Sequence, residues 1–69
     1  MTYCDVSLPV PLDRAFTYLL PETLRPRVQP GCRVLVPFGS RKLTGVVLRS
    51  HDEPPEGEVR EALRLAGAS

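Results

Sequence analysis

The sequence of 69 residues contains no tryptophan, one histidine and two cysteines, and it has no long apolar run. A transmembrane helix needs about 20 consecutive apolar residues, so a membrane span of this kind is excluded. The N-terminus also lacks the basic and then apolar segments of a secretory signal. We therefore expect the chain to act in the cytoplasm and not at a membrane.

The scarcity of cysteine and histidine leaves little material for a metal or catalytic site. Cys4 and Cys32 form no C-x-x-C pair, and the one histidine cannot complete a zinc site with them. Both cysteines lie in alternating apolar segments, which favours small buried residues over a disulfide. His51 adjoins acidic residues without a nucleophile at a recognisable spacing, so we interpret it as a solvated loop residue. No catalytic residue, metal site or cofactor is expected in this chain.

The two parts of the chain differ in charge although the whole is nearly neutral, with a formal net charge of +1. Residues 1–50 carry seven basic and three acidic side chains, hence +4, and residues 51–69 carry two basic and five acidic ones, hence −3. This asymmetry permits a basic face that would attract phosphate. On charge alone, a solvated surface with an acidic loop is the simpler interpretation.

Eight prolines and five glycines divide the chain into short segments, which argues against long helices. Apolar alternation and flanking turn residues predict four strands, at Thr2–Leu8, Phe16–Leu20, Cys32–Phe38 and Lys42–Ser50. Gly45, inside the last of these, indicates a bulge or a sharp bend. The segment Glu58–Ala66 fits both a helical face and a strand face, and its pattern slightly favours a helix.

Four or five short strands with regular turn signals predict a small all-β domain, either a barrel or a strongly bent sheet. The chain has room for one domain only, and no motor or nucleotide-binding fold fits within it. We expect residues 1–66 to form this domain and residues 67–69 to be a frayed or truncated end.

Two features favour a binding function. Phe16 and Tyr18 lie on one face of a predicted strand, with Thr17 on the other. The loop at residues 38–42, FGSRK, combines an accessible glycine backbone with two cations. Aromatic surface beside a basic loop is a common way to hold single-stranded nucleic acid. Without further context, however, aromatics that fill a thin core and cations that aid solubility are the simpler interpretation.

Three motifs, in order along residues 1–50, change this balance because they resemble one family. Residues 8–21, LPVPLDRAFTYLLP, resemble the opening of the PriA helicase family, L-P-x-P-L-x-x-x-F-x-Y-x-x-P. Residues 30–39, PGCRVLVPFG, resemble its P-G-x-R-V-x-V-P-F-G motif, and residues 42–48, KLTGVVL, its next strand. Each motif alone is loose, but the three together are specific.

The resemblance implies a small OB-like β-barrel that captures the 3′ end of the nascent leading strand at stalled replication forks. It implies a parent protein that is an ATP-dependent 3′→5′ DNA helicase of replication restart, whose ATP, magnesium and zinc belong to domains absent here. The implied partners are forked DNA with a free 3′ end, the remaining helicase domains, primosome proteins and single-stranded-DNA-binding protein. The implied location is the bacterial cytoplasm, at the nucleoid. The segment Glu58–Ala66 is then expected to be a strand that closes the sheet.

The residues expected to bind the DNA 3′ end are Phe16, Thr17, Tyr18, Gly39, Arg41, Lys42 and Arg60. Of these, Phe16, Thr17, Gly39 and Arg60 match the terminal-nucleotide pocket of the family. Thr17 departs from the family pattern, which commonly has Asp at this position. An ionised Asp only accepts hydrogen bonds, whereas a threonine hydroxyl donates and accepts and carries no charge. This substitution puts base-edge or 3′-hydroxyl recognition by a carboxylate in doubt.

Two further hypotheses remain open from the sequence. The domain is alternatively a protein-interaction or structural barrel, which docks on the helicase core without end-specific DNA binding. A homodimer formed by strand exchange is also a hypothesis, because a last strand on an exposed edge invites pairing with another copy.

Overall fold

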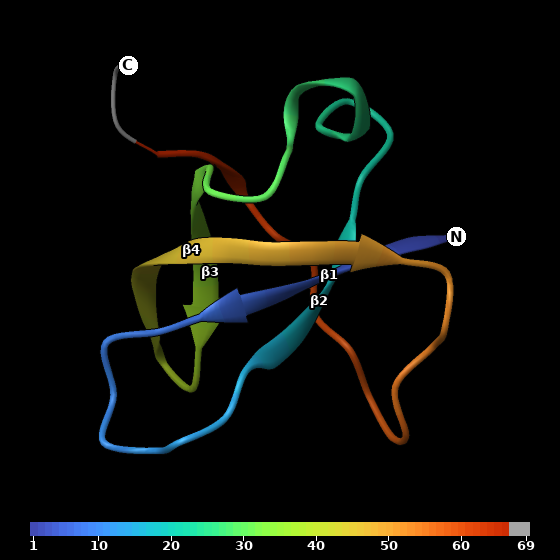
Figure 1. The fold of residues 1–69 in the computed structure, drawn as a ribbon. Helices are drawn as coiled ribbons and strands as arrows, with labels where there is room; N and C mark the ends of the chain where they lie inside the picture. Colours follow the sequence, from blue (N-terminus) through green and yellow to red (C-terminus); the bar gives the residue numbers. More distant parts are fainter. Residues whose placement is uncertain (67–69) are drawn as a thin grey trace.

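The computed structural model describes residues 1–66, which form five β-strands and one short 3-10 helix (Figure 1). The elements are β1 (Thr2–Ser7), β2 (Phe16–Leu20), η1 (Arg25–Arg27), β3 (Arg33–Phe38), β4 (Arg41–His51) and β5 (Arg64–Leu65). The predicted all-β fold class is confirmed. The expectation of a frayed or truncated end at residues 67–69 lies outside the described residues. Among residues 1–66, no helix has the length and apolarity needed to cross a membrane.

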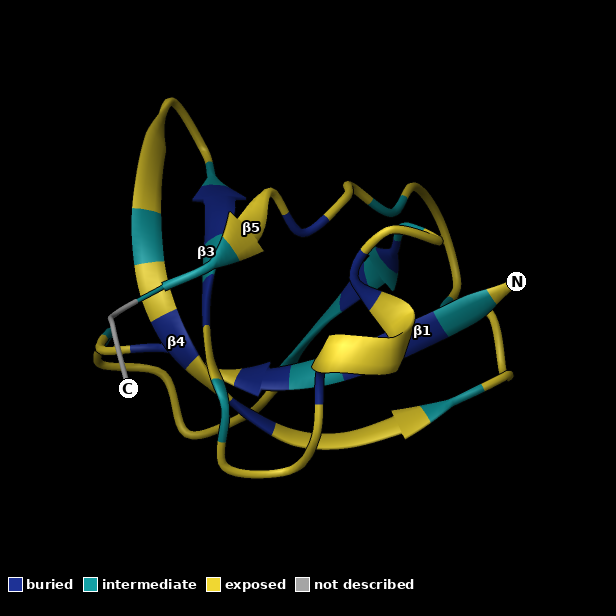
Figure 2. Ribbon diagram, turned by 90° about the horizontal axis from the view of Figure 1, so that it is seen from above, coloured by how far each residue is buried: buried dark blue, intermediate teal, exposed yellow. Residues whose placement is uncertain are grey.

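The five strands form one sheet in the order β2-β1-β4-β3-β5, and all neighbours are antiparallel. The sheet bends strongly, and β4 follows this curve along much of its length (Figure 2). One isolated parallel bridge, between Leu19 and Glu61, links β2 to the segment that leads into β5. The arrangement is consistent with an OB-like fold. It is not a closed barrel, so of the two forms that the strand pattern predicted, a barrel or a strongly bent sheet, the bent sheet is the one observed.

The segment Glu58–Ala66 is extended, and its strand β5 is only two residues long. The backbone N–H of Ala62 donates to the carbonyl oxygen of Leu19 on β2, at 2.9 Å. The N–H of Leu63 donates to the carbonyl oxygen of Leu35 on β3, at 2.8 Å. A helix would need these donors for its own ladder. The strand expected from the family resemblance is therefore confirmed in shortened form, and the helix favoured by the pattern is wrong.

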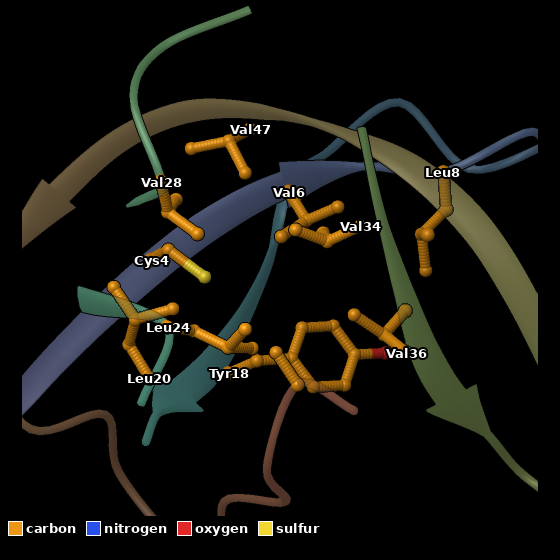
Figure 3. Packing of buried hydrophobic residues seen from close by; sticks show 11 residues of the cluster. Cys4, Val6, Leu8, Tyr18, Leu20, Leu24, Val28, Val34, Val36 and Val47 are labelled. Carbon is orange, nitrogen blue, oxygen red and sulfur yellow. The ribbon is translucent and has the colours of Figure 1, made fainter. Parts of the chain in front are cut away.

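The core lies on the concave side of the sheet and follows the alternation of the strands. Cys4 and Val6 on β1 are fully buried, as are Val34 and Val36 on β3. Figure 3 shows these side chains packed together with others of the core, namely Leu8, Tyr18, Leu20, Leu24, Val28 and Val47. Burial, with a smaller contribution from the charge of Asp5, raises the pKa of Cys4 to about 11. This buried thiol therefore stays protonated at neutral pH.

Cys32 differs from the prediction that both cysteines are buried. Its side chain is only partly buried at the start of β3, where Sγ lies 3.4 Å from the backbone nitrogen of Gln29. Both cysteines are free. Cys32 directly follows a turn at Pro30-Gly31 and packs against the edge of the core.

Gly45 on β4 lies close against the end of β1. A methyl group at this position would come within 2.7 Å of the Ser7 carbonyl oxygen and of Leu8 Cδ2, and closer still to Val6. The predicted bulge is not at Gly45. The register shift occurs where Asp5 and Val6 of β1 face β4, because Asp5 pairs with Arg49 and Val6 with Val47. The extra residue of β4 is thus Leu48.

Candidate nucleic-acid interface

The β3–β4 hairpin forms one wall of a hollow of about 410 Å³. Gly39 and Ser40 make the turn, and Gly39 has a φ of +59°, which is in the left-handed region that favours glycine. The other side of the hollow comes from the segment that leads into β5. The lining residues are Pro37, Gly39, Ser40, Arg41, Lys42, Arg60, Glu61 and Leu63.

Arg60 joins the two walls of this hollow. Its backbone is fixed beside β2, because its carbonyl oxygen accepts a hydrogen bond of 2.9 Å from the N–H of Leu19. Its side chain reaches the hairpin, where Nη1 donates to the carbonyl oxygen of Gly39 at 2.9 Å. Two of the predicted site residues, 21 positions apart in the sequence, are therefore in direct contact.

The hollow is positively charged overall. Arg41, Lys42 and Arg60 contribute three positive charges and Glu61 one negative charge, which gives +2. All four side chains belong to exposed residues. A concave site with this charge attracts phosphate groups and raises their local concentration.

Phe16, on β2, does not line this hollow, but it contacts Phe38 at the start of the hairpin turn. Its ring meets that of Phe38 edge to face, with the centroids 5.3 Å apart and the planes at 89°. Phe38 immediately precedes Gly39, so the aromatic pair adjoins the hairpin turn. Both rings are partly buried and pack against the core from one side. Their remaining surface makes them a platform on which a base could stack.

Tyr18 lies inside the core, with only 5% of its surface exposed (Figure 3). Its hydroxyl donates to the carbonyl oxygen of Pro37 at 2.8 Å. Burial raises the pKa of Tyr18, although the positive charge of Arg60 opposes this shift. The hydroxyl therefore stays protonated and holds β2 to β3 behind the hollow, where its ring is not available for stacking.

Thr17 points to the other face of the sheet. It pairs with Asp5 across β1 and β2, and its hydroxyl donates to Asp5 Oδ1 at 2.8 Å. The structure thus brings together Gly39, Arg41, Lys42 and Arg60 around one hollow, and Phe16 is linked to the hairpin only through its contact with Phe38. It separates Thr17 and Tyr18 from them, because alternate residues of a strand point to opposite faces and Tyr18 points into the core.

Comparison with known proteins identifies the family. The family model of the PriA 3′DNA-binding domain (3′BD) matches residues 5–68. The replication restart protein PriA of Bacillus subtilis is 36% identical over 72 residues, which cover the whole chain and 8% of that relative. The corresponding protein of Haemophilus influenzae is 43% identical over 61 residues, which cover 88% of the chain and 8% of the relative.

The chain belongs to the PriA 3′DNA-binding domain family. It spans less than a tenth of the length of these curated relatives. The domain is thus one of DNA binding in replication restart proteins, and no catalytic domain is evident in it.

The threonine that departs from the PriA pattern has a carboxylate beside it. Asp5 is directly opposite Thr17, and its side chain is only 16% exposed. Because Thr17 gives its hydroxyl proton to Asp5, its oxygen is left as an acceptor for any further partner. A group that can donate a hydrogen bond, such as the hydroxyl of a sugar, would therefore meet an acceptor at this position, as it would with an aspartate.

Two residues at the end of β4 complete the cluster around Asp5. Arg49 Nε donates to Asp5 Oδ2 at 2.8 Å, and His51 Nε2 lies 2.9 Å from Asp5 Oδ1. The backbone N–H of Glu53 donates to His51 Nδ1, so Nε2 holds the proton and donates to Asp5. His51 is the last residue of β4 with a side chain only 14% exposed, so its interpretation as a solvated loop residue is wrong.

No local pattern in the sequence indicates this cluster. Alternation placed Asp5 and Thr17 on the outer faces of two strands, but it did not show that they are opposite each other. The extra residue Leu48 reverses the alternation of β4, so that Arg49 and His51 also point outward. Without that bulge, both residues would share the inner face with Val47.

Asp5 contributes stability that depends on pH. Burial alone would raise its pKa, but hydrogen bonds from His51, Thr17 and Arg49 lower the pKa below its usual value. Since the folded-state pKa is below that of the unfolded chain, the stabilisation is present above about pH 4 and is lost as the pH falls through the folded-state pKa.

We expect Asp5→Asn to lower the free energy of unfolding at pH 7 by about 1–2 kcal/mol, because bonds to a charged acceptor become bonds to a neutral one. The difference from wild type should shrink as the pH falls below about 4, where the wild-type carboxylate becomes protonated. Urea unfolding across this pH range measures both effects, and Asp13→Asn in the exposed loop is the control. A difference that stays constant with pH would contradict a role for the charge.

Proposed function

We propose that this chain recognises the 3′ terminus of DNA at stalled replication forks and serves a longer replication restart protein. The observation that carries the proposal is the convergence of Gly39, Arg41, Lys42 and Arg60 on one hollow, whose hairpin turn directly follows Phe38, the ring partner of Phe16. The terminal base stacks on Phe16, the backbone at Gly39 lets the sugar approach closely, and the cations neutralise the nearby phosphates. No chemical step takes place in this domain.

The hollow also contains a carboxylate, that of Glu61. A free 3′-hydroxyl can donate a hydrogen bond to it, whereas a terminal 3′-phosphate would be repelled by its negative charge. Backbone oxygens of the hairpin accept in the same way. The preference for a free 3′-hydroxyl therefore comes from hydrogen-bond acceptors in the hollow. The basic side chains around these acceptors attract the phosphates that precede the terminal nucleotide.

The other domains of the longer protein would supply the additional affinity and the partner contacts that binding to a fork requires. A single base stacked on an aromatic ring contributes about 1–3 kcal/mol, so the isolated domain binds weakly. Tethering to the other domains of an ATP-dependent 3′→5′ helicase, with its own magnesium and zinc, would raise the effective affinity. Contacts with primosome proteins and single-stranded-DNA-binding protein would also come from those domains. The place of work is the bacterial cytoplasm, at the chromosome.

The test compares two labelled oligonucleotides that differ only in their 3′ end, one with a hydroxyl and one with a phosphate. We expect the hydroxyl form to bind more tightly and Phe16→Ala to weaken it about tenfold, by loss of the stacking platform. Fluorescence anisotropy measures both affinities. Phe16→Leu, which keeps an apolar contact with Phe38, is the control for packing and should weaken binding to a similar extent. Equal affinity of the wild type for both ends would overturn end recognition.

A second candidate function is docking on the parent protein without DNA. Leu12 and Leu48 are each about half exposed, at 51% and 50%, and they line a separate hollow of about 240 Å³. Exposed apolar side chains that gather in a hollow are typical of protein contacts. Binding of DNA that does not weaken with added salt or change with the DNA end would favour this function, because phosphate contacts must depend on salt.

A further inference from the structure

Arg14 covers the ring on which the terminal base is proposed to stack. Its guanidinium carbon Cζ lies over the Phe16 ring, 4.6 Å from the centroid. Arg14 belongs to the loop between β1 and β2, and its side chain is exposed. This distance is typical of a cation held against an aromatic face. The position is not among the residues that the family resemblance assigned to the site.

The neighbours of Phe16 leave Arg14 on the side that faces solvent. Phe38 contacts the ring at 5.3 Å between centroids, and the pair packs against the core. The core therefore covers one side of the Phe16 ring, and the Arg14 guanidinium covers the side from which a base would approach. Any base that stacks on Phe16 must either push Arg14 away or slide beneath it.

The loop that carries Arg14 can accommodate a base beneath the guanidinium. Within this loop, the backbone hydrogen bond that the structure shows is a local one, from the N–H of Val10 to the carbonyl oxygen of Leu8. Residues 11–15 are exposed and are joined to no strand. An arginine side chain also has several rotatable bonds, so that it can move outward by the thickness of one base without unfolding the sheet.

The chemistry of a guanidinium favours stacking on the base over departure from it. The group is planar and weakly hydrated, and it stacks on nucleobases as well as on aromatic side chains. Its charge also remains close to the phosphate that precedes the terminal nucleotide. If the Arg14 side chain moved away from the site, it would lose its contact with the Phe16 ring and would gain only contacts with water.

We propose that Arg14 forms the outer wall of a slot, in which the terminal base of the DNA lies between the Phe16 ring and the Arg14 guanidinium. The proposal rests on the proposed function, because it assumes that the terminal base reaches Phe16. Arg14 is then a DNA-binding residue that contacts the base, and the contact seen in the free protein is the closed, empty slot.

The experiment uses two oligonucleotides with the same phosphates and a free 3′-hydroxyl, one with a normal terminal nucleotide and one whose terminal nucleotide lacks its base. Arg14→Ala should bind the normal oligonucleotide about tenfold more weakly than wild type, through loss of one stacking contact. On the oligonucleotide without the terminal base, Arg14→Ala and wild type should differ by less than about threefold, because only a charge is lost. Arg14→Lys, which keeps the charge but not the plane, should resemble Arg14→Ala on the normal oligonucleotide.

Three results would overturn the slot. If Arg14→Ala binds DNA more tightly than wild type, the guanidinium is a cover that the base displaces. If it loses the same factor on both oligonucleotides, Arg14 is a phosphate contact only. If Arg14→Lys binds as wild type does, the planar group is not needed. In all three cases, a wild type that prefers the normal oligonucleotide keeps the proposed function intact, and a wild type that binds both equally overturns that function as well.

Discussion

Gly45→Ala is expected to lower the free energy of unfolding by about 3 kcal/mol or more. The added methyl group would lie 2.7 Å from the Ser7 carbonyl oxygen, which belongs to the backbone of β1 and cannot rotate away. To make room, β4 would have to move off β1 and break the central pairing of the sheet. Overpacking of this kind costs about 1–3 kcal/mol, and more where backbone must move. A domain of this size has a stability of only about 3–10 kcal/mol in total.

Thr44→Ala is the matched control for this prediction. Thr44 is the neighbour of Gly45 on the same strand, but its side chain is exposed. Its replacement should change the free energy of unfolding by less than about 1 kcal/mol, as is usual at the surface. Urea unfolding followed by circular dichroism compares the two variants with wild type. If Gly45→Ala were as stable as Thr44→Ala, the close approach of β1 and β4 would not limit the residue at this position.

The sequence predicted most of the strands because alternation and turn residues are local signals. The predicted strand Thr2–Leu8 became β1 with a difference of one residue, and Phe16–Leu20 is identical to β2. The signal failed at Glu58–Ala66. The hydrogen bonds of that segment go to β2 and β3, which are distant in the sequence. No local pattern contains this information, so the pattern favoured a helix that the tertiary structure does not form.

The site was predictable only in part, for a similar reason. The hairpin residues Gly39, Arg41 and Lys42 are neighbours in the sequence, so a local motif was enough to group them. Arg60 was predicted as a site residue only from the family resemblance. The structure shows why it belongs with the hairpin residues, because its side chain donates a hydrogen bond to the carbonyl oxygen of Gly39. Arg14 escaped attention because its contact with Phe16 depends on the path of an irregular loop, for which periodicity makes no prediction.

The contact between Arg60 and Gly39 couples two parts of the proposed site. The extended segment holds the backbone of Arg60 beside β2, and the side chain in turn holds the hairpin that presents Arg41 and Lys42. The position of the hairpin and the charge of the hollow therefore both depend on Arg60. A substitution that reverses its charge acts on both.

Arg60→Glu is accordingly expected to weaken binding of a 3′-hydroxyl oligonucleotide about 100-fold at low salt. It changes the charge of the hollow from +2 to 0, places a carboxylate where a phosphate should lie, and removes the donor to the Gly39 carbonyl. Between close charges near a protein surface, such a reversal is worth about 2–4 kcal/mol. Added salt screens these charges, so the loss of affinity should become smaller at about 200 mM salt. At this ionic strength the Debye length is about 7 Å.

Arg25→Glu separates this local effect from the effect of net charge. It makes the same change in total charge, but η1 lies at the top of Figure 1, whereas the β3–β4 hairpin lies at the bottom. Arg25→Glu should reduce affinity by less than about threefold, since screening limits the reach of surface charges. Anisotropy titrations at two salt concentrations, with circular dichroism to verify folding, decide the matter. Equal losses in the two variants would mean that DNA responds to the charge of the whole domain and not to the hollow around Gly39.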